Sequence, residues 1–96
     1  MKTIEMPTSL DQEIVTMLRA IGNPVRYRIL QILADQGECQ CGPLGDQLPI
    51  AASTLSQHLK VLREAGLIKG IVDGPTICYC RDEERIDWLK RHIQDL

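Results

Sequence analysis

Residues 48–68 constrain the fold more than any other stretch, because their middle reads as one helix with two different faces. Leu55, Leu59 and Leu62 recur at i, i+4 and i+7, which places them on one side of a 3.6-residue helix. Gly66 follows, and glycine readily adopts the left-handed conformation that ends a helix. The pattern predicts a helix that packs on the core through its leucines.

The opposite face of this helix carries short polar groups. Ser53, Gln57 and Lys60 lie roughly opposite the leucines, and Thr54 and Ser56 flank them. Hydroxyl, amide and ammonium groups are the ones that reach base edges and phosphates in a major groove of DNA. The face therefore predicts DNA contact, although an ordinary amphipathic surface helix explains it equally well when the helix is considered alone.

Composition limits the class of protein. The 96 residues, 44% of them hydrophobic, predict one domain over residues 1–96 with a modest core that a partner subunit would help to stabilise. Phe is absent, so Leu, Ile and Val must build this core. The formal net charge of -2 argues against a strongly basic nucleic-acid binder, and any DNA contact must come from a local patch.

No targeting or membrane segment is evident in the sequence. Residues 1–7 contain no apolar run of signal-peptide length, and no stretch approaches the roughly 20 apolar residues of a membrane span. We therefore expect a cytoplasmic protein with no membrane contact. In that compartment, four cysteines point to thiols, a metal site or redox chemistry rather than to structural disulfides.

Residues 1–8 read as a loose lead-in to two helices. Ser9 and Gln12 fit a capping box at the start of the first helix, which Gly22 ends. Asn23 and Pro24 then start the second helix as its N-cap and first-turn residue. Apolar residues at helical spacing give each helix an inward face: Leu10, Ile14, Met17, Leu18 and Ile21 in the first, and Val25, Ile29, Leu30 and Leu33 in the second.

The middle of the chain reads as a helix-turn-helix. Residues 38–41 form a short extended piece, and residues 44–48 a very short helix that Pro49 ends. Only a few residues separate this helix from the one that carries Ser53, so the two make a helix-turn-helix.

A wing and a last helix follow. The pattern changes to period two, with strands over residues 67–72 and 75–80 and a hairpin turn at Asp73 and Gly74. Asp82 caps the last helix. The apolar stripe of this helix is Ile86, Leu89, Ile93 and Leu96. The predicted fold is mainly α with a small β-hairpin wing, in the order α-α-β-α-α-β-β-α.

Two segments resemble the ArsR/SmtB family of winged-helix repressors. Residues 20–30, A-I-G-N-P-V-R-Y-R-I-L, resemble the entry to the second helix of that family. Residues 53–68, S-T-L-S-Q-H-L-K-V-L-R-E-A-G-L-I, are similar to its recognition helix. The resemblance extends from residue 15 to the last helix.

This resemblance implies a homodimeric transcriptional repressor on double-stranded DNA. The dimer would join through the first and last helices, and two recognition helices would enter successive major grooves of a palindromic operator. The residues that it places at or near DNA are Ser53, Thr54, Ser56, Gln57, His58 and Lys60. His58 lies closer to the apolar edge of the helix, and packing with a hydrogen bond to a carbonyl is the alternative role for it.

Two positions depart from the family pattern. The family usually has a serine cap where Ala51 stands, and Ser53 is the alternative cap here. The wing tip, residues 73–75, lacks the arginines that often reach the minor groove, which leaves Lys69 as the only basic candidate.

The family's ion sites transfer poorly to this chain. The cysteine box E-L-C-V-C-D-L corresponds to E-C-Q-C-G-P-L at residues 38–44, with both cysteines shifted by one position, which weakens a transfer of the arsenic site. A zinc site on the family's last helix needs histidine and acidic residues, and only His92 is present there. We therefore reject that zinc site and expect His92 at the surface.

A different thiol site follows from alternation along extended segments. Cys39 and Cys41 share one face, and so do Cys78 and Cys80. If the two segments pair, all four thiols converge, and they suit Zn²⁺, Cd²⁺, Cu⁺ or trivalent arsenic and antimony. The alternative is that one pair packs as small apolar residues while the other faces solvent.

We therefore predict a repressor rather than an enzyme. A thiophilic metal or metalloid bound at cysteine thiolates would release it from DNA, and arsenite or antimonite is the first candidate for this inducer. No resident cofactor is required. The alternative keeps the repressor and changes the signal to thiol oxidation or reactive sulfur, because facing cross-strand cysteines can form disulfides.

A thiol oxidoreductase or metal carrier is disfavoured because no C-x-x-C motif is present. A winged helix used only for protein contacts is disfavoured by the polar helix face.

Overall fold

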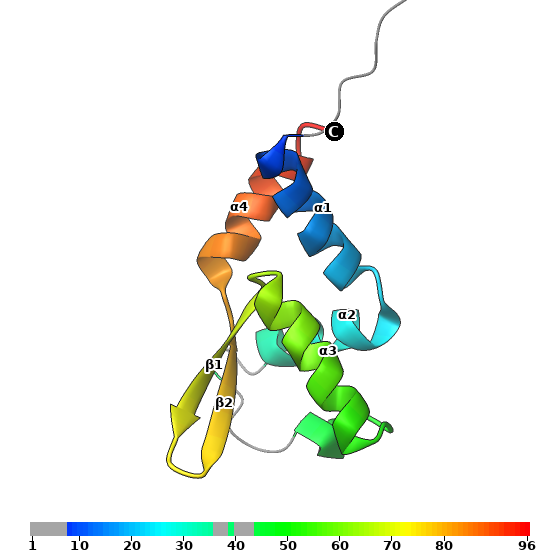
Figure 1. Ribbon diagram of the computed structural model, residues 1–96, viewed down its shortest axis with the longest axis vertical. Helices are drawn as coiled ribbons and strands as arrows, with labels where there is room; N and C mark the ends of the chain where they lie inside the picture. The colour runs from blue at the N-terminus through cyan, green and yellow to red at the C-terminus, as the bar shows by residue number, and fades with distance from the viewer. Residues whose placement is uncertain (1–7, 36–38, 40–43) are drawn as a thin grey trace, which may run out of the picture.

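Helices and one hairpin make up the part of the chain that the computed structural model describes, residues 8–35, 39 and 44–96 (Figure 1). The elements there are α1 (Ser9–Ile21), α2 (Pro24–Asp35), the 3-10 helix η1 (Leu44–Gln47), α3 (Ala52–Glu64), β1 (Ile68–Asp73), β2 (Thr76–Arg81) and α4 (Glu83–Ile93). α1 and α4 lie together at one end, and the hairpin extends away from them (Figure 1). This is the predicted mainly helical winged helix-turn-helix.

The predicted strand before the helix-turn-helix is not among the described strands. Cys39 has no regular structure, and residues 38, 40 and 41 lie outside the described residues. In the described part of the chain the sheet has two strands, β1 and β2. The predicted short third helix is a single 3-10 turn, η1.

The start of α1 corrects the predicted cap by one residue. Thr8, not Ser9, is the N-cap: its hydroxyl accepts from the Asp11 N–H at 3.2 Å, and the Asp11 carboxylate accepts from the Thr8 N–H at 3.0 Å. The reciprocal partner is therefore Asp11 rather than Gln12. The Thr8 hydroxyl and backbone N–H hold the pKa of Asp11 below its usual value. This stabilisation is present above the ordinary carboxyl pKa and is lost as the pH falls through the lowered one.

The other predicted caps are confirmed. The Asn23 side-chain oxygen accepts from the N–H groups of Val25 and Arg26 at 2.9 and 3.2 Å, and Pro24 is the first residue of α2. Asp82 caps α4 through the Arg85 N–H at 3.2 Å. Gly22 follows the last residue of α1, and Gly66, after α3, has a φ of +82°. These residues fix where the helices begin and end.

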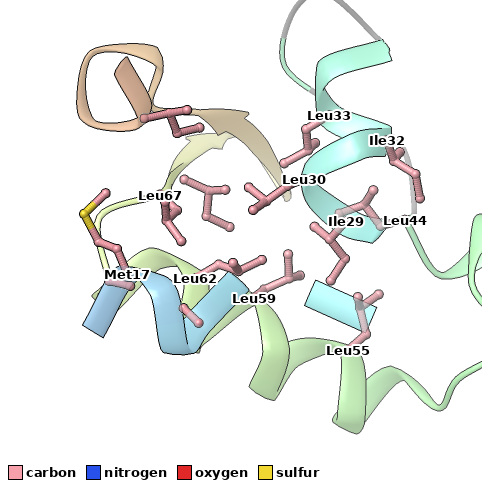
Figure 2. Close-up of a cluster of buried hydrophobic side chains, with 14 of the residues drawn as sticks. Met17, Ile29, Leu30, Ile32, Leu33, Leu44, Leu55, Leu59, Leu62 and Leu67 are labelled. Atoms are coloured by element: carbon pink, nitrogen blue, oxygen red, sulfur yellow. The ribbon is translucent and has the colours of Figure 1, made fainter. Parts of the chain in front are cut away.

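One hydrophobic cluster joins the elements (Figure 2). Its most deeply buried large side chains are Met17, Ile29, Leu62 and Leu67, which come from α1, α2, α3 and the segment before β1. The predicted stripe of α3, Leu55, Leu59 and Leu62, is buried in it. Burial of this stripe determines which face of α3 points outward.

Three residues of the predicted apolar faces lie outside the core. Leu10 and Leu18 on α1 are exposed, and Leu96 is 97% exposed because α4 ends at Ile93. The prediction that Leu96 belongs to the apolar stripe was wrong, because the spacing of apolar residues in the sequence continues past the point where α4 ends.

The hairpin turn also differs by one residue. Asp73 pairs with Thr76, so the two loop residues are Gly74 and Pro75 rather than Asp73 and Gly74. Pro75 has no N–H to donate to the ladder, which favours its place in the loop. Gly74 has a φ of +60°, and proline fixes a negative φ, which is the sign pattern of a type II′ turn.

Adjacent residues on α3 test this packing. Leu62→Ala removes a side chain that is 0% exposed, so we expect a loss of about 2–5 kcal/mol in the free energy of unfolding. Val61→Ala is the matched control at 38% exposure, with an expected change within about 0.5 kcal/mol. Urea denaturation followed by circular dichroism measures both. Equal losses for the two variants would contradict the orientation of α3.

Candidate nucleic-acid interface and thiol pair

The outward face of α3 has the predicted composition. Ser53, Thr54, Ser56, Gln57 and Lys60 are exposed on the side away from the buried leucines. Lys60 is 4.0 Å from Glu64, and both side chains are well exposed, so the pair is weak. The Lys60 ammonium can therefore exchange this partner for a phosphate at little cost. That these residues contact DNA stays a prediction.

The N-terminus of α3 has no side-chain cap. Ala51 is the N-cap residue and accepts no hydrogen bond through its side chain, and Ser53 lies inside the helix, so the alternative cap at Ser53 was wrong. The first turn contains no acidic residue. Its N–H groups and the positive end of the helix dipole thus face outward, an arrangement that favours an anion such as a phosphate.

His58 is held by an arginine rather than by a carbonyl. It is half-buried, and its Nδ1 lies 3.2 Å from Nη1 of Arg26 on α2. The predicted alternative of packing against the protein therefore fits its position, with a different partner. Sequence reasoning did not find this role for Arg26.

The wing is weakly basic. Lys69 is exposed on β1, whereas Arg81 at the end of β2 is directed to the protein: its Nη1 donates to the Leu30 carbonyl at 3.1 Å and its Nε donates to Glu83 at 2.8 Å. Arg81 therefore ties β2 to α2 and α4. Contact of Lys69 with DNA stays a prediction.

A disulfide joins the stretch before the helix-turn-helix to the wing. Cys39 and Cys80 form a disulfide with their Cα atoms 4.2 Å apart. Cys39 is exposed, whereas Cys78 and Cys80 are buried on one face of β2, as alternation predicted. Cys78 is also bonded, and Cys41 lies outside the described residues. Cys39 of the predicted extended segment is thus joined to the wing strand.

A disulfide sulfur is not a thiolate, so the state described is not the metal-binding one. Within residues 8–35, 39 and 44–96 no group of three or more His, Cys, Asp or Glu side chains is placed to hold a metal ion. A role of Cys39, Cys41, Cys78 and Cys80 as metal ligands stays a prediction that requires their reduced form.

His92, predicted at the surface, is half-buried. Its Nδ1 bonds the Trp88 carbonyl oxygen at 2.7 Å.

Comparison with known proteins identifies the family. A family model described as a helix-turn-helix domain matches residues 21–71. An uncharacterised helix-turn-helix transcriptional regulator of Methanocaldococcus jannaschii is 31% identical over 81 residues, which cover 83% of this chain and 90% of that protein. A crystal structure of a possible transcriptional regulator for arsenical resistance is 31% identical, with a TM-score of 0.73 over 83% of this chain and 82% of that one. This chain belongs to the ArsR/SmtB family.

A further ArsR/SmtB relative senses a metal. The cadmium metal-sensor CmtR of Mycobacterium tuberculosis is 33% identical, with a TM-score of 0.60 over 86% of this chain and 81% of that one. The matched relatives are described as transcriptional regulators, and the residues that the family model matches, 21–71, include α3. Within residues 8–35, 39 and 44–96, no helix combines the length and the hydrophobicity that a membrane span requires.

The uncapped start of α3 can be tested by restoring a cap. Ala51 has extended backbone angles that suit an N-cap, so Ala51→Ser should raise the free energy of unfolding by about 1 kcal/mol. Ala52→Ser adds the same hydroxyl one residue inside the helix, where serine is slightly unfavourable. Urea denaturation compares the two. If Ala51→Ser is no more stable than Ala52→Ser, the helix does not begin at this residue.

Proposed function

We propose that this chain is a cytoplasmic, homodimeric repressor that binds its operator in the reduced state and releases it when Cys39 and Cys80 are oxidised. The observation that carries the signal is the disulfide between Cys39, which precedes the helix-turn-helix, and Cys80 on the wing strand. This favours the alternative of thiol oxidation over the metal signal.

The DNA-binding part rests on α3. Its exposed face offers two hydroxyls, an amide and an ammonium in one continuous patch, from Ser53, Ser56, Gln57 and Lys60. An amide such as that of Gln57 can read adenine through two hydrogen bonds, and an ammonium neutralises phosphate. Because the formal net charge is -2, this local patch must supply the attraction, and we expect modest salt dependence.

The dimer rests on an apolar surface of α1. Leu10, Val15 and Leu18 are exposed at 47%, 45% and 39%, next to the helix face that packs on the core. α4 lies beside α1 at the same end of the molecule (Figure 1). A second copy that covers these side chains removes them from water and sets the two α3 helices at a fixed spacing. Half-sites about 34 Å apart would match one turn of DNA.

The redox step is balanced by an external oxidant. Forming the sulfur–sulfur bond removes two electrons and two protons from the Cys39 and Cys80 thiols, and a peroxide or a disulfide compound accepts them. Exposed Cys39 is the sulfur that such an oxidant reaches first. The bond then fixes Cys39 against β2, which Arg81 already ties to α2.

Release needs little free energy. A coupling of about 1–3 kcal/mol between the thiol state and DNA binding changes operator affinity by about 5- to 150-fold. A disulfide that shifts η1 relative to β2 alters the start of the helix-turn-helix. Small displacements there change the angle and spacing of the two recognition helices on the operator.

A metal signal is the second candidate, supported by the likeness to a cadmium sensor. In reduced protein, Cys39, Cys78 and Cys80 offer thiolates for Cd²⁺, Zn²⁺, Cu⁺ or trivalent arsenic and antimony. The metal or metalloid is an inducer in this scheme, and no resident cofactor is needed.

The recognition face is tested by truncation. Gln57→Ala and Lys60→Ala together should weaken binding to a duplex selected from a random pool by at least about tenfold, and Lys60→Ala should lower the salt slope by about one. Gln31→Ala and Lys90→Ala, exposed residues of the same types on α2 and α4, are the matched controls. Fluorescence anisotropy measures all four. Unchanged affinity in the α3 variants would exclude this face from the interface.

The signal is tested on the same duplex. Diamide should weaken DNA binding of the wild type by about tenfold, and dithiothreitol should restore it. Cys39→Ser and Cys80→Ser, checked for folding by circular dichroism, should bind like the reduced protein and lose the response to diamide. Release of reduced protein by Cd²⁺, with no response to diamide, would support the metal candidate instead. If neither agent acts, thiol control is wrong although DNA binding can stand.

A further inference from the structure

The Arg26 guanidinium lies where three helices meet. Its Nε donates to the Ala20 carbonyl at 2.6 Å and its Nη2 to the Arg19 carbonyl at 3.4 Å, both near the C-terminus of α1. Its Nη1 lies 3.2 Å from Nδ1 of His58 on α3. Arg26 is itself fixed at the start of α2, where its backbone N–H donates to Asn23. One side chain therefore connects the end of α1, the start of α2 and the middle of α3.

The chemistry of this contact assigns the histidine tautomer. A guanidinium carries only donors and stays protonated, so Nδ1 of His58 must be the acceptor. An imidazole that accepts through Nδ1 is neutral and carries its proton on Nε2. An imidazolium has no acceptor and would place a second positive charge beside Arg26.

The carbonyl groups explain why the guanidinium stays in place. The last carbonyls of a helix lack intrahelical partners and form the negative end of its dipole. Arg26 satisfies two carbonyls at the end of α1, and the planar shape of its group leaves one nitrogen directed at α3. His58 is half-buried between the leucine stripe and exposed Gln57. A fixed His58 therefore fixes the rotation of α3 and with it the direction of the polar face.

We propose that Arg26 and His58 are positioning residues for DNA recognition: they lock α3 against the end of α1, with His58 held as the neutral Nε2–H tautomer. This inference rests on the proposed function for its effect on DNA. Because α1 is the proposed dimer helix, the contact joins the dimer geometry to the orientation of the recognition helix. Nδ1 is occupied by Arg26, so the sequence-based role of His58 at DNA is limited to its Nε2–H.

Matched substitutions at residue 58 separate positioning from packing. His58→Leu fills the space and favours the helix but cannot accept a hydrogen bond. His58→Asn is the poorer helix former, yet its side-chain oxygen stands where Nδ1 stood, both being bonded to Cγ. We expect His58→Leu to bind the selected duplex roughly tenfold more weakly, with little change on a scrambled duplex, and His58→Asn to stay within about threefold of the wild type. Thermal unfolding verifies that both variants fold.

The arginine is tested in the same assay. Arg26→Lys keeps the charge but cannot reach two carbonyls and His58 at once, so it should lose roughly tenfold in affinity for the selected duplex. Arg91→Lys on α4, an exposed arginine, is the control and should bind like the wild type. A folded His58→Leu protein that retains wild-type affinity and selectivity would overturn the proposal.

Nitrogen-15 NMR of the imidazole tests the contact without DNA. At pH 7.5 the wild type should show the Nε2–H tautomer at His58, and Arg26→Lys should shift its Nδ1 resonance, whereas Arg91→Lys should not. An Nδ1–H tautomer in the wild type would refute the contact. If no duplex is bound by the wild type, the proposed function fails, and this spectrum alone decides whether the Arg26–His58 contact exists.

Discussion

Burial of the leucine stripe of α3 is the constraint on which the rest of the structure depends. Leu55, Leu59 and Leu62 enter a core built from Leu, Ile and Met side chains of every helix, since the chain has no Phe to fill the space (Figure 2). Once that stripe is buried, the 3.6-residue period of the helix places the residues on its opposite side at the surface. The outward direction of the polar face of α3 therefore follows from the packing of the core. Rotating the helix would expose the leucines, at a free-energy cost of roughly 25 cal/mol per Å² of apolar surface.

The fold was predictable where local chemistry fixes it, and the errors have local causes. Asn23 and Asp82 cap helices because their short side chains reach nearby N–H groups, and this depends on a few adjacent residues only. The cap at Ser9 was one residue late because Asp11 competes with Gln12 as the reciprocal partner of the cap. The hairpin turn was displaced because the missing N–H of Pro75 outweighed the turn signal of Asp73 and Gly74.

The site was predictable only in part, because its connecting contacts span long sequence distances. Arg26 meets His58 32 residues away, and Arg81 meets Leu30 51 residues away, so neither contact leaves a periodic signal in the sequence. Alternation placed Cys78 and Cys80 on one face of a strand, which the structure confirms. Which sulfur joins Cys39 depends on how that segment lies against β2, and a shift of one residue would reverse the faces.

Two different kinds of bond connect the parts around the helix-turn-helix. On the wing side, a disulfide connects Cys39 with β2 and Arg81 connects β2 with α2. On the other side, Arg26 connects the middle of α3 with the end of α1. The covalent bond can be made or broken by an oxidant or a reductant, whereas the arginine contact involves no thiol. Under the proposed function, a signal at the thiols therefore acts directly on the wing side alone. We propose that the Arg26–His58 contact then keeps α3 attached to α1 while the wing side changes, so that the signal alters the angle at which α3 meets DNA.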